Sequence, residues 1–320
     1  MPLRLTEMSR DDPGAEVQHV TGPASVISQP VHALLRGLVD YAGLFPPAAL
    51  SMGEAARQYA SHLDSREAWM LGRFVVPVGR LDELAAASDA LFDDASEPWR
   101  LSALIGDAYA EAGQRIREFN SKNRRRFVVD VIECRPVEAG AVAGTVDVLP
   151  GEMRIFVELA RLDDPHATLE EIAAAGAWAK ARTGGMTAEA FPSARQLARF
   201  IACAVEVKVP FKATAGLHHP MAGTYPLTYA ADAPVGHMFG FLNLFGACVF
   251  AQVGASESKL VALLQEGDAD AIVLDGDMLT WRDLSANAKQ IASTRAVLGI
   301  SFGSCSFTEP VDGLRALGLL

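Results

Sequence analysis

The sequence has little cysteine and little positive charge. Its four cysteines, Cys134, Cys203, Cys248 and Cys305, form no CxxC pair and no metal-ligand spacing. We expect reduced, buried thiols in a cytoplasmic protein, since disulfide frameworks and zinc sites need suitably spaced cysteines. The 28 Lys and Arg residues are outnumbered by 39 Asp and Glu residues, and the net charge is −11. We expect no nucleic-acid partner, because binding a polyanion requires a positively charged surface.

Long hydrophobic runs are also absent. A helix that spans a membrane needs about 20 apolar residues, whereas the richest stretch, Met238 to Val253, is interrupted by Gly240, Asn243 and Gly246. We therefore predict a buried helix there and no membrane partner. Residues 1–30 mix Arg, Asp, Pro, Gly and Ser without the apolar core of a signal peptide. This composition predicts a disordered N-terminal tail or cap.

The glycine-rich loops of nucleotide-binding folds are missing too. Neither GxGxxG nor GxxxxGKS/T occurs, which argues against a doubly wound nucleotide-binding sheet. From residue 31 onward, short β-branched runs alternate with Ala-rich amphipathic stretches, a pattern typical of βαβ units. Eight candidate strands predict an α/β fold of the closed (β/α)8 TIM-barrel type: Leu38–Gly43, Arg73–Pro77, Leu101–Gly106, Arg126–Ile132, Met153–Leu159, Ala177–Thr183, Val209–Ala215 and Val297–Gly303.

The eight strands predict one domain, residues 31–320, with an insertion at about residues 221–296 between the last two strands. The insertion is too long for a single helical return, and no Pro/Ser/Gly linker separates it as a second domain. Within it, Asp270–Leu274 is compatible with a strand and Trp281–Ser293 with a helix. Its role stays open at this point.

Two lysines lie inside candidate strands that are otherwise apolar. Alternate residues of a strand share one face, so Lys180 and Arg182 point one way, as do Lys212 and Gly216 in the next strand. A charge is less costly in the barrel lumen than beneath the helices, so we predict that Lys180, Lys212 and Asp130 face the lumen. Active sites of such barrels lie at the carboxyl ends of the strands, which makes these three side chains candidates for catalysis.

A lysine acts as a nucleophile only in its neutral form. Desolvation and a neighbouring cation lower the pKa of a lysine, and Lys212 and Arg182 are the candidate neighbours of Lys180. A buried Lys–Asp ion pair without any catalytic role explains the same pattern equally well from spacing alone.

Two motifs, each of which contains one of the two lysines, resemble the motifs of a known protein family. The first motif is Lys180-x-Arg-Thr-Gly-Gly, and the stretch Phe191-Pro-Ser-Ala follows it. The second motif is Phe211-Lys-Ala-Thr-Ala-Gly216, in which Lys212 lies 32 residues after Lys180. This arrangement resembles the deoxyribose-phosphate aldolase (DeoC) family of class I aldolases. That family carries a Schiff-base lysine in a Lys-x-Ser/Thr-Thr-Gly strand and a second lysine in the strand that follows.

Three further stretches resemble the same family in collinear order. The first, Leu38–Ala48, matches the family's opening motif at Asp40, Leu44 and Pro46 or Pro47. The second, Phe127–Glu133, matches a Val-Asp-x-Val strand at Asp130. The third, Ile300–Phe307, matches the strand that helps to hold the substrate phosphate, at Gly303, Ser304 and Ser306.

The resemblance implies a carbon–carbon lyase of the aldehyde-lyase class without cofactor or metal. Lys180 would form an imine with a carbonyl substrate, Lys212 would keep Lys180 neutral, and Asp130 with a water would carry protons. The resemblance implies substrate binding by Asp40, Thr183, Gly184, Gly216, Gly303 and Ser304. Arg182 and His218, which differ from the family pattern, are further candidates for substrate binding.

The sequence also departs from the family pattern. Where the family has Gly-Gly-Ile/Val-Arg after its second lysine, this chain has Ala215-Gly-Leu-His-His-Pro220 and so loses an arginine near the phosphate. Arg182 replaces a small residue beside the nucleophile and is a candidate contact for a carboxylate or phosphate. We therefore expect a small aldehyde, ketone or keto acid rather than deoxyribose phosphate as substrate.

Two other functions stay open. His218 with Glu133 or Glu158 is compatible with a metal-dependent lyase, although adjacent histidines of a strand point to opposite faces and only one of His218 and His219 readily reaches the lumen. A non-catalytic barrel that binds a small ligand or assembles with partners is the second alternative. The sequence does not determine the oligomeric state, and an oligomer of identical chains is compatible with it.

Overall fold

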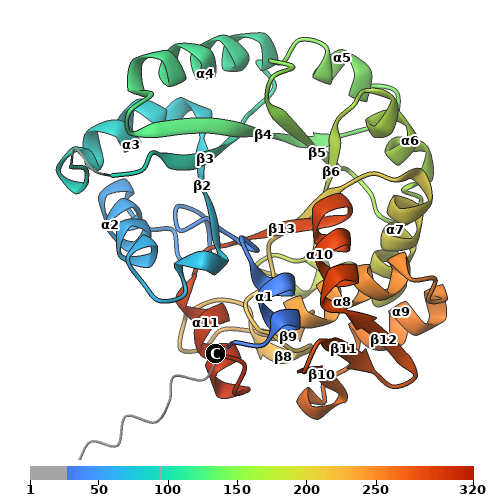
Figure 1. The fold of residues 1–320 in the computed structure, drawn as a ribbon. Helices are drawn as coiled ribbons and strands as arrows, with labels where there is room; N and C mark the ends of the chain where they lie inside the picture. The colour runs from blue at the N-terminus through green and yellow to red at the C-terminus, as the bar shows by residue number, and fades with distance from the viewer. Residues whose placement is uncertain (1–26, 94–95) are drawn as a thin grey trace, which may run out of the picture.

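The fold is a closed parallel β-barrel surrounded by helices (Figure 1). The computed structural model describes residues 27–93 and 96–320. Its eight barrel strands pair in the order β1-β13-β7-β6-β5-β4-β3-β2, and this confirms the predicted TIM-barrel fold. The strands are β1 (Val39–Tyr41), β2 (Leu71–Pro77), β3 (Trp99–Leu104), β4 (Phe127–Val137), β5 (Arg154–Leu159), β6 (Trp178–Arg182), β7 (Phe211–Thr214) and β13 (Gly299–Ser304).

Amphipathic helices cover the outside of the barrel, and α7 (Ala194–Val207) shows why they form. Ser193 caps this helix: its hydroxyl accepts from the Gln196 amide at 3.2 Å, while the Gln196 side chain accepts from the Ser193 amide at 2.8 Å. The buried side of α7 includes Leu197 and Ile201, four residues apart on one face. The other outer helices are α2 (Met52–Leu63), α3 (Leu81–Ala87), α4 (Tyr109–Asn123), α5 (Val142–Val146), α6 (His166–Ala174) and α11 (Thr308–Ala316).

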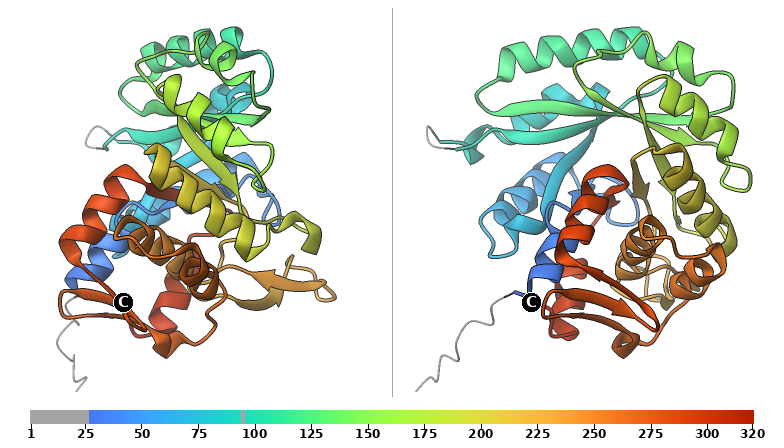
Figure 2. Two further views of the ribbon diagram at one scale, coloured as in Figure 1. Left: turned by 90° about the vertical axis from the view of Figure 1, so that its right-hand side faces the viewer. Right: turned by 45° about the vertical axis from the view of Figure 1, so that its right-hand side comes forward.

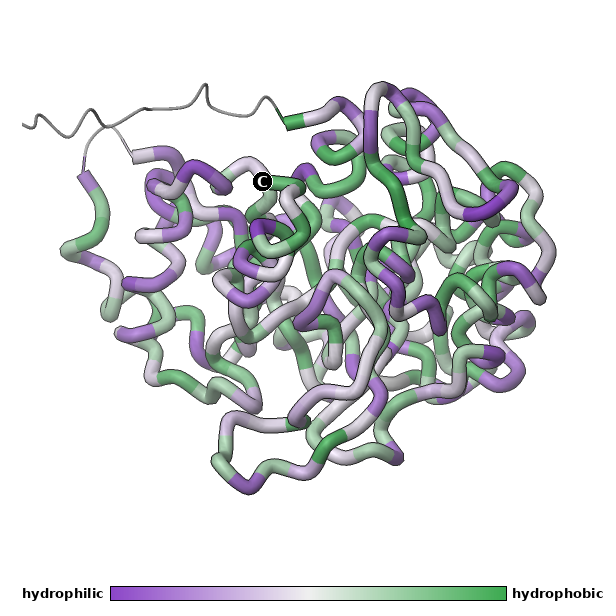
Figure 3. Tube along the Cα trace, turned by 90° about the horizontal axis from the view of Figure 1, so that it is seen from below, coloured by the Kyte–Doolittle hydropathy of each residue, from purple (hydrophilic) through white to green (hydrophobic). Residues whose placement is uncertain are grey.

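Hydrophobic and hydrophilic stretches alternate along the trace, as expected for helices with one buried face (Figure 3). The large core cluster lies between the barrel and its helices and joins side chains from most elements of the fold. The four cysteines are all buried and unpaired. Among the described residues, no helix is long and apolar enough to cross a membrane.

The insertion between β7 and β13 contains two small sheets, three α-helices and a single-turn 3-10 helix. The β8–β9 hairpin (Gly223–Pro226 and Val235–Met238) projects from the body of the molecule (Figure 2). Helix α8 (Phe241–Gln252) is almost completely buried, which confirms the buried helix predicted within Met238 to Val253. The rest comprises α9 (Glu257–Leu264), the sheet β10 (Ile272–Asp275), β11 (Met278–Trp281) and β12 (Leu284–Asn287), and α10 (Ala288–Val297).

One element of the insertion differs from the prediction. The strand expected at Asp270–Leu274 is present as β10, but the helix expected over Trp281–Ser293 begins only at Ala288. The preceding residues form the β11–β12 hairpin, in which Trp281 and Leu279 are buried at alternate positions. Buried and partly exposed side chains alternate with a period of two in β11, which is the pattern of a strand and not of a helix.

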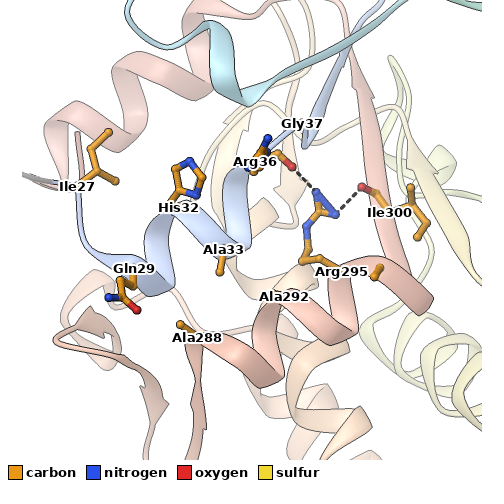
Figure 4. A pocket seen from close by; sticks show the side chains of 11 residues that line it. Ile27, Gln29, His32, Ala33, Arg36, Gly37, Ala288, Ala292, Arg295 and Ile300 are labelled. Atoms are coloured by element: carbon orange, nitrogen blue, oxygen red, sulfur yellow. Dashed lines mark hydrogen bonds between the residues drawn. The ribbon is translucent and has the colours of Figure 1, made fainter.

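Helix α1 (Gln29–Leu35) precedes β1, lies beside α10 and borders a cavity of about 650 Å³ (Figure 4). The partly buried Arg295 guanidinium joins the two helices to β13. It donates to the carbonyl oxygens of Leu34 at 2.8 Å, Arg36 at 3.0 Å and Gly299 at 2.7 Å, and to that of Ile300. Burial lowers the pKa of Arg295 to about 10. Arg295 thus provides hydrogen-bond donors for carbonyl groups at the end of α1.

The N-terminal tail is predicted for residues 1–30. Its residues 1–26 lie outside the described residues.

Candidate active site

Lys180 and Lys212 lie side by side in the barrel lumen. They are register partners on the adjacent strands β6 and β7, so their side chains leave the sheet on the same face. Their exposed fractions are only 3% and 1%. The structure therefore brings the two lysines together as the sequence predicts.

Glu133 bridges the two lysines. One of its carboxylate oxygens, Oε1, lies 2.5 Å from Lys212 Nζ, and the other, Oε2, lies 3.1 Å from Lys180 Nζ. Ser102 donates its hydroxyl to Glu133 Oε1 at 2.7 Å. Burial acts to raise the pKa of Glu133, but the two lysines and these hydrogen bonds outweigh it and hold that pKa far below its usual range. Glu133 is therefore ionised at neutral pH.

Two more carboxylates extend the arrangement on either side. Glu158 Oε2 lies 2.9 Å from Lys180 Nζ, and its Oε1 accepts from Arg182 Nε at 3.1 Å. Asp40 Oδ2 accepts from Lys212 Nζ at 2.8 Å. The three acidic and three basic groups alternate in space in the order Asp40–Lys212–Glu133–Lys180–Glu158–Arg182, which we call the charge chain.

The two ends of the charge chain differ in how tightly they are held. Asp40 also accepts from the Ser301 hydroxyl at 2.8 Å and from the Arg73 amide at 2.7 Å. Burial acts to lower the pKa of Lys212, but Asp40 and Glu133 outweigh it and raise that pKa above its usual value. Arg182, at the other end, is half-exposed, with 52% of its side chain accessible. Lys212 is thus a fixed ammonium, whereas the Arg182 end faces solvent.

Asp130 does not join this site, so the predicted placement beside the lysines is wrong. Its carboxylate accepts from Arg73 Nε at 2.6 Å and from Arg100 Nη2 at 2.5 Å. The register between β3 and β4 shifts between Leu101 and Ser102, which leaves Asp130 as an extra residue of a β-bulge. The bulge shifts the alternation of faces by one residue, so Glu133, three residues after Asp130, points toward the lysines.

A cavity of about 480 Å³ opens above the lysines at the carboxyl ends of the strands. Lys180, Lys212 and Glu133 line its polar floor, and Arg182 and His218 also contact it. Most of the remaining lining is apolar and comes from the loop after β1, from the loop after β6 and from the β8–β9 hairpin: Phe45, Pro46, Pro47, Met186, Ala190, Leu227 and Met238. The cavity therefore combines a charged floor with apolar walls.

The loops after β6 and β7 are locked together at the rim of this cavity. Thr183 is fully buried and donates its hydroxyl to the Ala215 carbonyl at 2.6 Å. Gly184 and Gly216 meet so closely that a Cβ on Gly216 would lie 2.8 Å from Gly184 Cα. Gly216 also has a φ of +74°, which favours glycine. Thr183 and Gly184 therefore shape the rim, whereas Gly216 lines the cavity itself.

The other predicted binding residues also fall into two groups, those that line the cavity and those that support residues around it. Gly303 lines the cavity, at the end of β13. Ser304 is buried, and its hydroxyl accepts from the Ser306 amide at 3.3 Å. Asp40 lies beneath the floor, where it holds Lys212. The structure thus places Arg182, Gly216, His218 and Gly303 at the cavity, and gives Asp40, Thr183, Gly184 and Ser304 supporting contacts.

At the mouth of the cavity, His218 binds a residue that the sequence analysis does not identify. Its Nδ1 lies 2.8 Å from Glu309 Oε2, and Glu309 also accepts from the Tyr229 hydroxyl at 3.1 Å. Glu309 comes from α11 and Tyr229 from the connection within the β8–β9 hairpin. Within residues 27–93 and 96–320, no group of three or more His, Cys, Asp or Glu side chains is placed to hold a metal ion.

The most important residues missed by the sequence analysis are the carboxylates beside Lys180. Glu133 and Glu158 enter that analysis only as partners for a metal. A signal for them is nevertheless present, because each follows a run of apolar strand residues, Val131-Ile132 before Glu133 and Ile155-Phe156-Val157 before Glu158. A charge after such a run lies toward the carboxyl edge of the barrel. No family model and no curated protein matches the chain.

Proposed function

We propose that the protein is a Schiff-base carbon–carbon lyase in which Lys180 forms an imine with a small carbonyl compound. The proposal is based on one observation: the Lys180 amine lies on the floor of a 480 Å³ cavity, and Glu133 links it to a second buried lysine. This arrangement supplies both a nucleophile and a path for its protons. Free, buried cysteines are compatible with the cytoplasmic location expected for such an enzyme.

The contacts of the two lysines favour Lys180 as the nucleophile. Lys212 makes hydrogen bonds of 2.8 Å and 2.5 Å to two carboxylates, which hold its pKa high and keep it protonated. Lys180 has ion-pair contacts of 3.1 Å and 2.9 Å, and both of the carboxylates involved are oriented by other partners as well. Among residues 27–93 and 96–320, Lys180 therefore has two carboxylate bases within 3.1 Å and donates no hydrogen bond that fixes it as the two hydrogen bonds of Lys212 do.

Glu133 takes the role that the sequence analysis assigns to Asp130. Lys180 must lose a proton before it attacks the carbonyl carbon, and the Glu133 and Glu158 carboxylates lie within 3.1 Å to accept it. The resulting carbinolamine loses its hydroxyl group as water when a proton is delivered to it. Glu133 supplies the proton that it accepted from Lys180 and returns to its ionised form, which the Lys212 ammonium stabilises through its hydrogen bond. The product is an iminium ion that withdraws electrons from the neighbouring carbon–carbon bond.

The cavity limits the substrate class. Apolar walls favour a short carbon skeleton with few hydroxyl groups. The half-exposed Arg182 guanidinium, bound to Glu158 through Nε, has its remaining N–H groups for a carboxylate or a phosphate. A small aldehyde, ketone or keto acid fits these features.

Reductive trapping tests this proposal. The protein is incubated with acetaldehyde, acetone or pyruvate in the presence of borohydride, and its intact mass is measured. We expect a reduced adduct with at least one compound for the wild type and for Lys122→Met, in which an exposed helix lysine is replaced, but not for Lys180→Met. Absence of any adduct from the wild type would overturn the proposal and favour a ligand-binding barrel.

A further inference from the structure

The His218–Glu309 pair at the mouth of the cavity has the geometry of an oriented acid–base group. His218 is mostly buried, with 13% of its side chain exposed, and its Nδ1 lies 2.8 Å from Glu309 Oε2. Tyr229 donates to the same Glu309 oxygen at 3.1 Å, so the carboxylate is itself held in place. These residues come from three separate parts of the chain: the loop after β7, the β8–β9 connection and α11.

Glu309 determines which nitrogen of His218 carries the proton. Burial acts to raise the pKa of Glu309, but the hydrogen bond and charge of His218 and the hydrogen bond from Tyr229 outweigh it and lower that pKa below its usual value. An ionised Glu309 accepts the Nδ1 proton, so the neutral imidazole carries its lone pair on Nε2. Nε2 makes no hydrogen bond to any of the described residues. His218 is thus left with an unpaired base.

The backbone brings only one of the two adjacent histidines to the cavity. The positive φ angles of Ala215 and Gly216, +65° and +74°, turn the chain sharply after β7. His218 then lines the cavity that contains Lys180, whereas the His219 ring stacks on Tyr225 with 3.6 Å between ring centroids. His219 therefore offers a matched control, because it has the same side chain at the next position and a different environment.

We propose that His218 is the acid–base residue of the carbon–carbon bond step, and that the substrate is a β-hydroxy carbonyl compound; this inference rests on the function proposed above. In the cleavage direction, His218 Nε2 takes the proton of the β-hydroxyl group of the Lys180-bound iminium ion. The oxygen's electrons form the carbonyl of the leaving aldehyde or ketone, the bond between the α and β carbons breaks, and its electrons neutralise the iminium as an enamine. Glu309 is a positioning residue that stabilises the imidazolium formed.

The charge chain and the His218 pair therefore serve different steps. Glu133 and Lys212 lie at the nitrogen end of the bound substrate, where water is lost and regained. His218 lies at the mouth of the same cavity, where the β-hydroxyl group of an extended substrate would lie. Imine formation should consequently survive loss of His218, whereas bond cleavage should not.

Two assays on the same variants separate these steps. Trapping with acetaldehyde, acetone and pyruvate plus borohydride measures imine formation alone. Cleavage is followed with the corresponding β-hydroxy compounds, namely 3-hydroxybutanal, 4-hydroxy-4-methylpentan-2-one and 4-hydroxy-2-oxopentanoate. The variants are His218→Asn, His218→Ala, Glu309→Gln and the control His219→Asn.

For His218→Asn we expect trapping within about threefold of the wild type and a fall of about 10²- to 10⁴-fold in kcat for cleavage. Glu309→Gln should lower kcat at least about tenfold with little change in KM, since it disturbs the tautomer and not binding. Added imidazole should restore part of the activity of His218→Ala, and His219→Asn should keep wild-type activity.

The proposal is overturned if His218→Asn cleaves within threefold of the wild-type rate. It is equally overturned if trapping and cleavage fall together and imidazole restores neither, because His218 would then serve only to hold α11 against the barrel. A wild type that forms no adduct at all would instead refute imine chemistry itself, so the two failures are distinguishable.

Discussion

Replacing Glu133 by glutamine should destabilise the protein and stop imine formation at the same time. Glu133 is 2% exposed and contacts two lysines and a serine hydroxyl. A glutamine keeps one oxygen as acceptor but directs an amide N–H group toward one lysine ammonium. It also leaves the charge chain with one uncompensated positive charge. Removing one partner from such a buried arrangement costs about 3–5 kcal/mol of the free energy of unfolding.

This cost should depend on pH in a defined way. The pKa of Glu133 is lowered in the folded protein, so its stabilising contribution is present above its unfolded-state pKa of about 4.3 and is lost as the pH falls below that value. The pKa of Lys212 is raised, so its contribution is present below about pH 10.4 and is lost as the pH rises through its folded-state pKa. The difference between wild type and Glu133→Gln should therefore be largest between about pH 5 and pH 10.

Urea denaturation followed by tryptophan fluorescence at pH 4, 7 and 10 measures this difference. Glu83→Gln, which removes an exposed ion pair with Arg80, is the control and should change stability little at any of these pH values. The borohydride adduct of Glu133→Gln should form about 10²- to 10⁴-fold more slowly than that of the wild type. A stability difference that is below about 1 kcal/mol at pH 7, or that does not shrink at pH 4, would refute the electrostatic reasoning.

Two other substitutions test the placement of charged residues. Asp130→Asn should leave the rate of adduct formation unchanged, because Asp130 pairs with Arg73 and Arg100 away from the lysines; a loss like that of Glu133→Gln would contradict the bulge. Arg295→Met should lower the free energy of unfolding by about 3 kcal/mol or more, since it leaves carbonyl groups of α1 and β13 without donors, and urea denaturation measures this loss.

The strands of the barrel could be predicted because each is a short apolar run between amphipathic helices. The lumenal positions of Lys180 and Lys212 could also be predicted, since a strand alternates its faces and the two strands pair directly. The β-bulge at Asp130 could not, because an extra residue in one strand leaves no signal in the alternation of its own side chains and appears only against the neighbouring strand. The one extra residue reverses which face the following side chains occupy, and so Glu133 reaches the lysines whereas Asp130 does not.

The mouth of the cavity was less predictable than its floor. His218 and Glu309 are separated by 91 residues, and their contact depends on how α11 packs against the loop after β7. The β8–β9 hairpin, which supplies Leu227, Met238 and Tyr229, lies in an insertion whose position relative to the barrel no local pattern specifies. Contacts of this kind come from tertiary packing alone.

The central claim is that Lys180, and not Lys212, is the amine that reacts with the substrate. Peptide mapping of the borohydride-reduced adduct by mass spectrometry tests it most directly. We expect the added mass on the peptide that contains Lys180, with Lys212 unmodified. An adduct on Lys212 would contradict it, because the amine fixed between Asp40 and Glu133 would then be the nucleophile.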